Sequence, residues 1–192
     1  MTDEILHIFQ KSGALFEGHF QLTSGLHSPT YFQCARVLQY PEYNQFLAEK
    51  IVTHFSSVSI DVVISPAIGG IVVGQEVGRQ LGVRTIFAER RNGQLQLRRG
   101  FEIGTKENVL VCEDVVTTGG SVQEVIDLVQ GQGANAKGVG IIVDRSNGTV
   151  DFPVNQYAIV QLNAITYSPE TCPLCQKAVP IQKPGSRGMF NN

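Results

Sequence analysis

The chain has 192 residues, of which 42% are hydrophobic and 17% are charged, and its formal net charge is −2. Such a composition is typical of a globular protein with one principal core, and it excludes a disordered or fibrous chain. Surfaces that bind nucleic acid usually carry a clear excess of clustered Lys and Arg, so the charge balance argues against that class of protein.

The sequence favours the cytoplasm over export or the membrane. Residues 1–11 are acidic where a secretory signal would be basic. The most apolar segment, residues 62–74, is shorter than the roughly 20 residues that a membrane-spanning helix needs. Two cysteines in apolar surroundings, Cys34 and Cys112, fit free thiols under reducing conditions. We therefore expect a cytoplasmic protein.

The first third of the chain has a helix pattern, a strand pattern and a second helix pattern. Residues 3–11 have the periodicity of a short helix, and residues 16–22 alternate as a strand does. A turn is expected at residues 24–30. Pro41 suits the first turn of an amphipathic helix that runs to about Phe55.

From residue 62 onward, short apolar strands alternate with helices. The expected strands are 62–65, 83–88, 109–112, 139–143 and 157–162, and the expected helices are about 70–81 and 120–132. This alternation predicts an α/β fold with a mainly parallel sheet covered by helices on both faces. Ligands of such folds bind beyond the carboxyl ends of the strands, which here are the loops 65–70, 113–120 and 144–148.

Two further segments have distinctive compositions. Residues 89–108 are polar and carry four arginines around Asn92-Gly93, which predicts an arginine-bearing hairpin or flap. A solvated hairpin without a function is the alternative. The tail, residues 168–192, contains four prolines and is expected to pack as an extended arm with little regular structure.

The strongest chemical signal is the run from Val109 to Ser121, in which four apolar residues deliver two acids into a turn rich in hydroxyls and glycines. A helix is expected directly after the turn, so its first amides and its positive dipole end would face a bound phosphate. Ionised Glu113 and Asp114 suit the vicinal hydroxyls of a ribose and, directly or through water, Mg²⁺. A strand-to-helix turn with a hydroxyl cap is the alternative for the turn alone. The acid pair favours the binding site, with both acids at a solvent-facing strand end.

This run resembles, over its whole length, the phosphoribosyl-pyrophosphate motif of the type I phosphoribosyltransferases. The resemblance implies that fold, with Mg²⁺ as a cofactor held mainly by phosphoribosyl pyrophosphate and with Asp114 able to contact it through water. It implies that Glu113 and Asp114 hold the ribose hydroxyls. It also implies that a cradle for the 5′-phosphate is formed by Val115, Val116, Thr117, Thr118, Gly119, Gly120 and Ser121.

The loop at residues 65–70 stands where that family places its pyrophosphate-binding turn. The resemblance implies that Gly69 and Gly70 bind pyrophosphate there, because exposed amides in such a turn form an anion-binding nest. Glycines that serve a tight turn and close helix packing, together with Gly74 and Gly78, are the alternative.

Residues 20–32 resemble the N-terminal signature of the orotate phosphoribosyltransferase family, in which a Leu-x-Ser-Gly turn and a later aromatic pair line the pyrimidine site. The resemblance implies an orotate site formed by Thr23, Tyr31, Phe32, Thr117 and Arg145. An arginine suits the carboxylate of orotate because its planar fork donates two hydrogen bonds. Core packing is the alternative for the aromatic pair, and a surface ion pair with Asp144 is the alternative for Arg145.

The resemblance covers nearly the whole chain as a single domain, residues 1–192, with residues 1–40 forming part of a hood over the base. It implies transfer of the phosphoribosyl group from phosphoribosyl pyrophosphate to orotate, in pyrimidine biosynthesis, by a homodimer. A phosphoribosyltransferase for another base and a non-catalytic sensor of phosphoribosyl pyrophosphate are the alternatives. The implied catalytic residues are Glu113, Asp114, Arg90, Arg91, Arg98 and Arg99, with the loop 89–100 completing the neighbouring subunit's site.

The chain departs from better-known members of that family in its lysines. Where those members carry lysine, this chain has Thr23, Gly69 and, in the loop 89–100, arginine or glutamine. We expect the loop arginines to supply the positive charge that the lysines provide elsewhere.

A Cys-x-x-Cys pair in the tail, Cys172 and Cys175, raises the alternative of a zinc-dependent interaction module. A closed zinc site needs four ligands, and the tail offers only these two. We therefore expect an uninvolved pair, whose joint replacement by serine leaves activity and bound metal unchanged.

Overall fold

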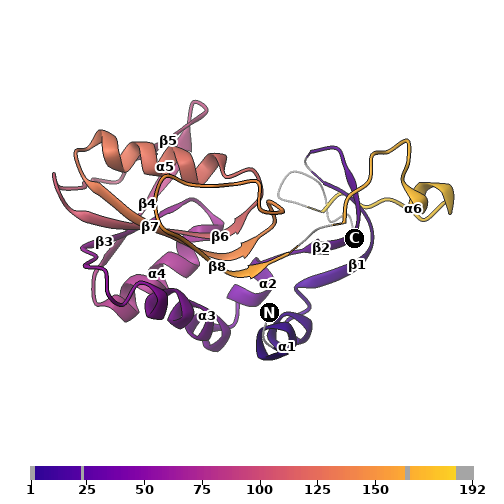
Figure 1. The fold of residues 1–192 in the computed structure, drawn as a ribbon, viewed down its shortest axis with the longest axis horizontal. Helices are drawn as coiled ribbons and strands as arrows, with labels where there is room; N and C mark the ends of the chain where they lie inside the picture. The colour runs from indigo at the N-terminus through magenta and orange to yellow at the C-terminus, as the bar shows by residue number, and fades with distance from the viewer. Residues whose placement is uncertain (1–2, 23, 163–164, 185–192) are drawn as a thin grey trace.

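The structure is a computed structural model that describes residues 3–22, 24–162 and 165–184 (Figure 1). In chain order its elements are α1 (Asp3–Lys11), β1 (Leu15–Gln21), β2 (His27–Phe32), α2 (Ala35–Leu38), α3 (Pro41–His54), β3 (Val62–Pro66), α4 (Gly69–Leu81), β4 (Arg84–Arg91), β5 (Gln94–Leu97), β6 (Asn108–Val116), α5 (Gly120–Gly131), β7 (Asn135–Asp144), β8 (Gln156–Gln161) and α6 (Pro173–Gln176). None of the helices described is long and apolar enough to cross a membrane.

Six strands form the main sheet, in the order β5-β4-β3-β6-β7-β8. All neighbours pair in parallel except β4 and β5, which form an antiparallel hairpin. The predicted mainly parallel sheet is therefore confirmed. The strand order turns back on itself between β3 and β6, and a sheet of this kind binds ligands at that switch point.

Helices cover both faces of this sheet, as predicted. In Figure 1, α5 lies above the sheet, and α3 and α4 lie below it. Along β3, Val62 and Ile64 belong to the core between the sheet and α5, whereas Val63 belongs to the core between the sheet and helices α3 and α4. Because successive strand residues point to opposite faces, the apolar run of β3 supplies both cores. A strand without a polar face can only lie in the middle of such a sheet.

A second sheet, of two strands, lies apart from the main sheet. It pairs β1 with β2, and the C-terminal segment 165–184 runs beside it (Figure 1). Isolated bridges join Phe20 to Gln182 and His27 to Tyr167. We call β1, β2 and residues 165–184 the terminal module.

Two expectations are corrected in the terminal module. The turn expected at 24–30 ends early, because β2 begins at His27 and its residues pair with β1. Within residues 168–184 the tail includes the short helix α6, which Pro173 begins at a position that suits proline.

Candidate active site

The acid pair lies within β6. The expected strand 109–112 would instead place the pair just beyond the end of the strand. The strand continues to Val116 because it keeps pairing with β7, as far as Val116 opposite Asp144. Glu113 is buried, with 8% of its surface exposed, while Asp114 is half-buried. The expectation of two solvent-facing acids is therefore wrong for Glu113, since neighbouring residues of a strand face opposite ways.

The buried Glu113 carboxylate accepts a local backbone hydrogen bond. Its Oε1 accepts a hydrogen bond from the backbone N–H of Asp114 at 3.1 Å. Burial raises the pKa of Glu113 well above the usual carboxyl value, and the charge of Asp114 raises it further. Hydroxyl donors that approach a buried carboxylate stabilise its ionised form and so counteract the rise in its pKa.

The two buried cysteines near the acids are not nucleophiles. Cys34 and Cys112 are free and buried, as expected. Burial raises the pKa of both thiols, and the acid pair adds to this for Cys34. Both therefore remain neutral thiols, and a neutral thiol is a poor nucleophile.

The turn after β6 opens toward solvent at the start of α5. Gly119 caps the helix with φ 75°, and a Cβ there would lie 2.7 Å from Cγ1 of Val150, so only glycine fits. A small hollow of about 60 Å³ is lined by Glu113 and residues 115–122. The exposed hydroxyl residues Thr117, Thr118 and Ser121 lie around it. The implied phosphate cradle thus forms one concave surface at a helix N-terminus.

The loop after β3 meets the acid pair. A Cβ on Gly69 would lie 2.5 Å from both carboxylate oxygens of Asp114, and one on Gly70 would lie 2.9 Å from Oε1 of Glu113. Since β3 and β6 are parallel neighbours, their carboxyl ends bring the two loops together. A side chain at position 69 would displace the Asp114 carboxylate from its present position.

Helix packing accounts for the other two glycines of this region. A Cβ on Gly74 would collide with Oγ of Ser65, and one on Gly78 would collide with Oγ1 of Thr85. The packing alternative is thus right for Gly74 and Gly78. Gly69 lies against Asp114, whereas Gly70 lies against both Glu113 and the backbone of Cys112.

Arg145 and Tyr31 face each other beside the acids. The guanidinium carbon of Arg145 lies 5.7 Å from the centre of the Tyr31 ring. Burial raises the pKa of Tyr31. The positive charge of Arg145 lowers this pKa, and the negative charge of Asp114 raises it further. Within the described ranges no ion pair joins Arg145 to Asp144, whose carboxylate instead accepts the Ser146 N–H at 2.7 Å. The surface ion pair is therefore not the explanation of Arg145.

Two other expected base-site residues are not placed at this site. Phe32 is only 4% exposed, and its ring packs 4.7 Å from that of Phe9, so it belongs to the core. The core alternative is right for Phe32 because it points away from the face that carries Tyr31. Thr23 lies outside the described residues.

The expected arginine-bearing hairpin is confirmed as β4 and β5. Its arginines differ in what they contact. Arg90 forms a two-pronged ion pair with Glu124 of α5, at 2.9 and 3.1 Å, and Arg99 forms one with Glu89, at 2.9 Å for both bonds. Nη1 of Arg98 lies 3.8 Å from Oε1 of Glu89. For Arg91 the described part of the chain offers no ion-pair partner.

The acid pair fits Mg²⁺ only as a shared ligand. Among the described residues, the one group of three or more metal-ligating side chains is elsewhere, in the terminal module. Mg²⁺ takes oxygen ligands, keeps several waters and commonly binds through one or two carboxylates together with substrate phosphates. Asp114 fits that role.

Comparison with known proteins identifies the class and then the family. Residues 39–163 match the family model described as a phosphoribosyl transferase domain, so this is a phosphoribosyltransferase fold. An orotate phosphoribosyltransferase of Chlorobium phaeobacteroides (strain DSM 266 / SMG 266 / 2430) is 59% identical over 183 residues, covering 95% of each chain. One of Pelotomaculum thermopropionicum is 54% identical and covers 96% of this chain and 97% of its own. The chain belongs to the orotate phosphoribosyltransferase family.

The solved structures agree on the fold. The orotate phosphoribosyltransferase of Aeropyrum pernix superposes with a TM-score of 0.70 at 23% identity, covering 82% of this chain and 93% of its own. Adenine phosphoribosyltransferases also superpose, such as that of Rhodothermus marinus with a TM-score of 0.67. The fold alone therefore does not select the base.

Sequence reasoning missed one group of residues altogether. His19 and His27 lie beside the Cys-x-x-Cys pair in the terminal module. Two histidines on either side of one short turn are a usable signal, since antiparallel strands bring both ends of a hairpin together. The pairing of the tail with β1 and β2 was not visible in the sequence.

Proposed function

We propose that the protein transfers the phosphoribosyl group of phosphoribosyl pyrophosphate to a ring nitrogen of orotate and releases pyrophosphate, a step of pyrimidine biosynthesis. Family membership supports the reaction. One structural observation supports its location: Asp114 contacts the Gly69 loop on one side and acts electrostatically on Tyr31, which faces Arg145, on the other. Sugar-phosphate loops and a cationic aromatic site for the base therefore meet at Asp114.

The sugar phosphate is proposed to lie along the turn after β6. The amides of the first turn of α5 and the hydroxyls of Thr117, Thr118 and Ser121 donate to the 5′-phosphate. Glu113 and Asp114 accept hydrogen bonds from the two ribose hydroxyls. Gly69 and Gly70 bring backbone close to the pyrophosphate, next to those acids.

The base is proposed to bind between Tyr31, Thr117 and Arg145. Arg145 is half-buried and, among the described residues, has no carboxylate partner of its own. Burial lowers its pKa, yet an arginine stays protonated, so a ligand carboxylate is the natural counter-ion. The ring of Tyr31 offers a flat apolar surface to the pyrimidine.

The leaving group is proposed to be met by positive charge. Bound Mg²⁺ would neutralise charge on the pyrophosphate oxygens. The hairpin arginines Arg90, Arg91, Arg98 and Arg99 are proposed to act on the same group across a homodimer interface. Because the sugar develops positive charge as pyrophosphate departs, these donors favour the transition state more than the ground state.

Release of pyrophosphate measured with a panel of bases tests this function. We expect orotate to support release in the presence of Mg²⁺ and phosphoribosyl pyrophosphate, and uracil, adenine and hypoxanthine to support little. Arg145→Lys should weaken the preference for orotate over uracil, which lacks the carboxylate. Faster release with a purine would indicate another base, and tight binding without release for every base would indicate a sensor.

A further inference from the structure

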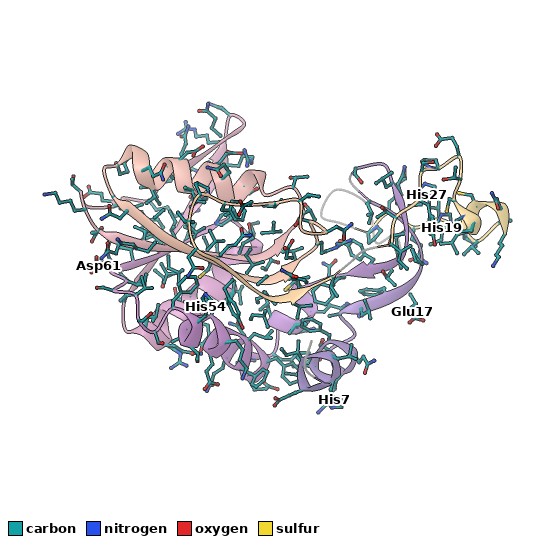
Figure 2. The ribbon with its side chains drawn as sticks, viewed as in Figure 1. His7, Glu17, His19, His27, His54 and Asp61 are labelled. Carbon is teal, nitrogen blue, oxygen red and sulfur yellow. The ribbon has the colours of Figure 1, made fainter. Side chains whose placement is uncertain are left out.

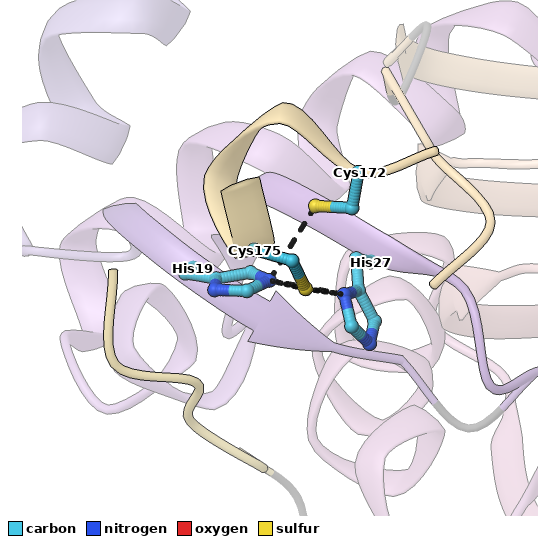
Figure 3. A group of neighbouring side chains, drawn as sticks. All are labelled: His19, His27, Cys172 and Cys175. Carbon is cyan, nitrogen blue, oxygen red and sulfur yellow. Dashed lines mark hydrogen bonds between the residues drawn. The ribbon is translucent and has the colours of Figure 1, made fainter. Parts of the chain in front are cut away.

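Four metal-ligating side chains, none of them a member of the acid pair, meet in the terminal module. His19 comes from β1, His27 from β2, Cys172 from the residue before α6 and Cys175 from within α6 (Figure 3). One ligand atom from each lies within 4.8 Å of all the others. Figure 2 shows His19 and His27 together there, while His7 and His54 lie elsewhere.

The separations between these atoms are close to those around one tetrahedral ion. Zn–S bonds of about 2.3 Å and Zn–N bonds of about 2.0–2.1 Å place neighbouring ligand atoms about 3.3–3.8 Å apart. Nε2 of His19 lies 3.6 Å from Sγ of Cys172 and 3.7 Å from Sγ of Cys175. Nδ1 of His27 lies 3.3 Å from Sγ of Cys175 and 3.0 Å from Nε2 of His19. An ion at the centre needs only small shifts.

Hydrogen bonds alone do not account for this arrangement. Nδ1 of His19 lies 2.8 Å from the carbonyl oxygen of Val179, which can only accept, so Nδ1 carries a proton and, in the neutral imidazole, Nε2 carries a lone pair. That single lone pair can accept one hydrogen bond, yet His27, Cys172 and Cys175 all approach it within 3.7 Å. A bond from the outer ring nitrogen to a backbone carbonyl is also the usual way in which a metal-binding histidine is oriented.

We propose that His19, His27, Cys172 and Cys175 bind one structural Zn²⁺ ion. Two thiolates and two imidazoles are ligands that zinc prefers, and four protein ligands close its coordination shell. Binding releases the two thiol protons, and the two thiolate charges then balance that of the ion. The reason for expecting an uninvolved cysteine pair disappears, because the two missing ligands come from β1 and β2.

The ion joins segments that are distant in the sequence. The backbone of Gln182 already bonds to both neighbours of Phe20, through His19 O and Gln21 N, each at 2.8 Å, and Tyr167 exchanges two bonds of 2.9 Å with His27. A two-stranded sheet is marginally stable by itself. Zinc therefore fixes the C-terminal segment to the hairpin whose second strand carries Tyr31.

Metal content of the purified full-length protein is the direct test. Mass spectrometry of the metals should find about one zinc ion per chain in the parent protein. Cys172→Ser with Cys175→Ser, and His19→Asn, should each lose most of it. His7→Asn and Cys34→Ala change the same residue types outside the cluster and should retain it. A parent protein that contains no zinc and takes up none, or a double serine variant that keeps it, overturns the proposal.

Cobalt substitution tests the site in the parent protein, so the result does not depend on whether a variant folds. Chelated parent protein titrated with Co²⁺ should show a thiolate-to-metal charge-transfer band and the intense visible bands of tetrahedral cobalt, and Zn²⁺ should abolish both. Weak bands typical of six oxygen ligands overturn the proposal. A disulfide between Cys172 and Cys175 in freshly purified protein under reducing conditions does so as well.

The functional consequence rests on the proposed function and is measured separately. Zinc removal with a chelator, followed by excess Mg²⁺, should lower the melting temperature by about 5 °C or more. It should raise KM for orotate more than KM for phosphoribosyl pyrophosphate, because Tyr31 belongs to the zinc-bound module. Added Zn²⁺ should reverse both changes. If zinc is bound but no base supports pyrophosphate release, the proposed function fails and the zinc site stands; an unchanged melting temperature overturns its structural role.

Discussion

The carboxyl edge of the main sheet and the terminal module, which we propose contribute to the same site, are stabilised differently. The edge rests on β3 and β6, whose apolar residues, apart from the partly buried Val115, are buried between two layers of helices. The terminal module has only two strands, one short helix and backbone bonds to a returning tail. We infer that the sugar-phosphate loops have a fixed geometry, whereas the base side depends on contacts between the two ends of the chain.

Asp114→Asn removes the charge at the point where the two regions meet and should have the largest effect. We expect turnover to fall by roughly 100-fold or more, because a neutral amide stabilises developing positive charge poorly. The melting temperature should change little, since Asp114 is half-buried at the rim of the sheet. Asp151→Asn, an exposed change of the same kind, is the matched control. Near-parental turnover in the Asp114 variant would place the sugar site elsewhere.

Arg145→Lys separates the base side from the sugar side. Lysine keeps the charge but loses the planar fork, so KM for orotate should rise by roughly tenfold while KM for phosphoribosyl pyrophosphate changes less. Arg84→Lys makes the same change at an arginine that bonds to Glu107, outside the site. Equal increases in both KM values would assign Arg145 to general stability.

Changes of the hairpin arginines test whether the β4–β5 hairpin is a third region that contributes to the site. Arg91 has no ion-pair partner among the described residues, so Arg91→Ala tests loss of charge without the breaking of an ion pair. At least one of Arg90, Arg91, Arg98 and Arg99 should lose roughly tenfold in turnover on change to alanine, with a smaller effect on substrate binding. Arg79→Ala, which breaks the ion pair with Glu76 on the exposed side of α4, is the control for the hairpin arginines that have ion-pair partners.

Mixing a hairpin variant with Asp114→Asn tests whether the hairpin acts on the neighbouring subunit. A mixed dimer would contain one site with both parts intact, so some activity should return. No recovery in spite of demonstrated subunit exchange, or full activity in all four alanine variants, would leave the hairpin as a solvated element.

Glu113→Gln should lower turnover less than Asp114→Asn does, and the sign of its effect on stability is diagnostic. The folded state favours the protonated Glu113 carboxyl and so raises its pKa. The free energy of unfolding is therefore highest at low pH, and it falls as the pH rises through the raised pKa, because the buried carboxylate then ionises. Glutamine has no such loss. The variant should therefore melt above the parent protein, by a margin that grows from acidic to alkaline pH, although its turnover falls roughly tenfold. A constant or negative difference would mean that burial does not penalise the carboxylate.

The sequence predicted the main sheet well because periodicity is a local property. The helix 3–11 and the parallel strands agree with the structure to within a few residues. One error, the end of β6, arose because pairing with β7 continues through two acids, and pairing is not written in either strand alone. Phe32 was misassigned for a related reason: a pair of aromatics gives no sign of which one faces the core.

By itself the sequence determined the α/β fold, the acid pair with its glycine turn and the family, since each is a contiguous pattern of residues. Only the tertiary structure decided that Gly69 lies against Asp114, that Tyr31 faces Arg145, and that His19 and His27 meet Cys172 and Cys175. Those contacts join residues far apart in the chain. They depend on how strands and tail pack together, and no local pattern encodes that packing.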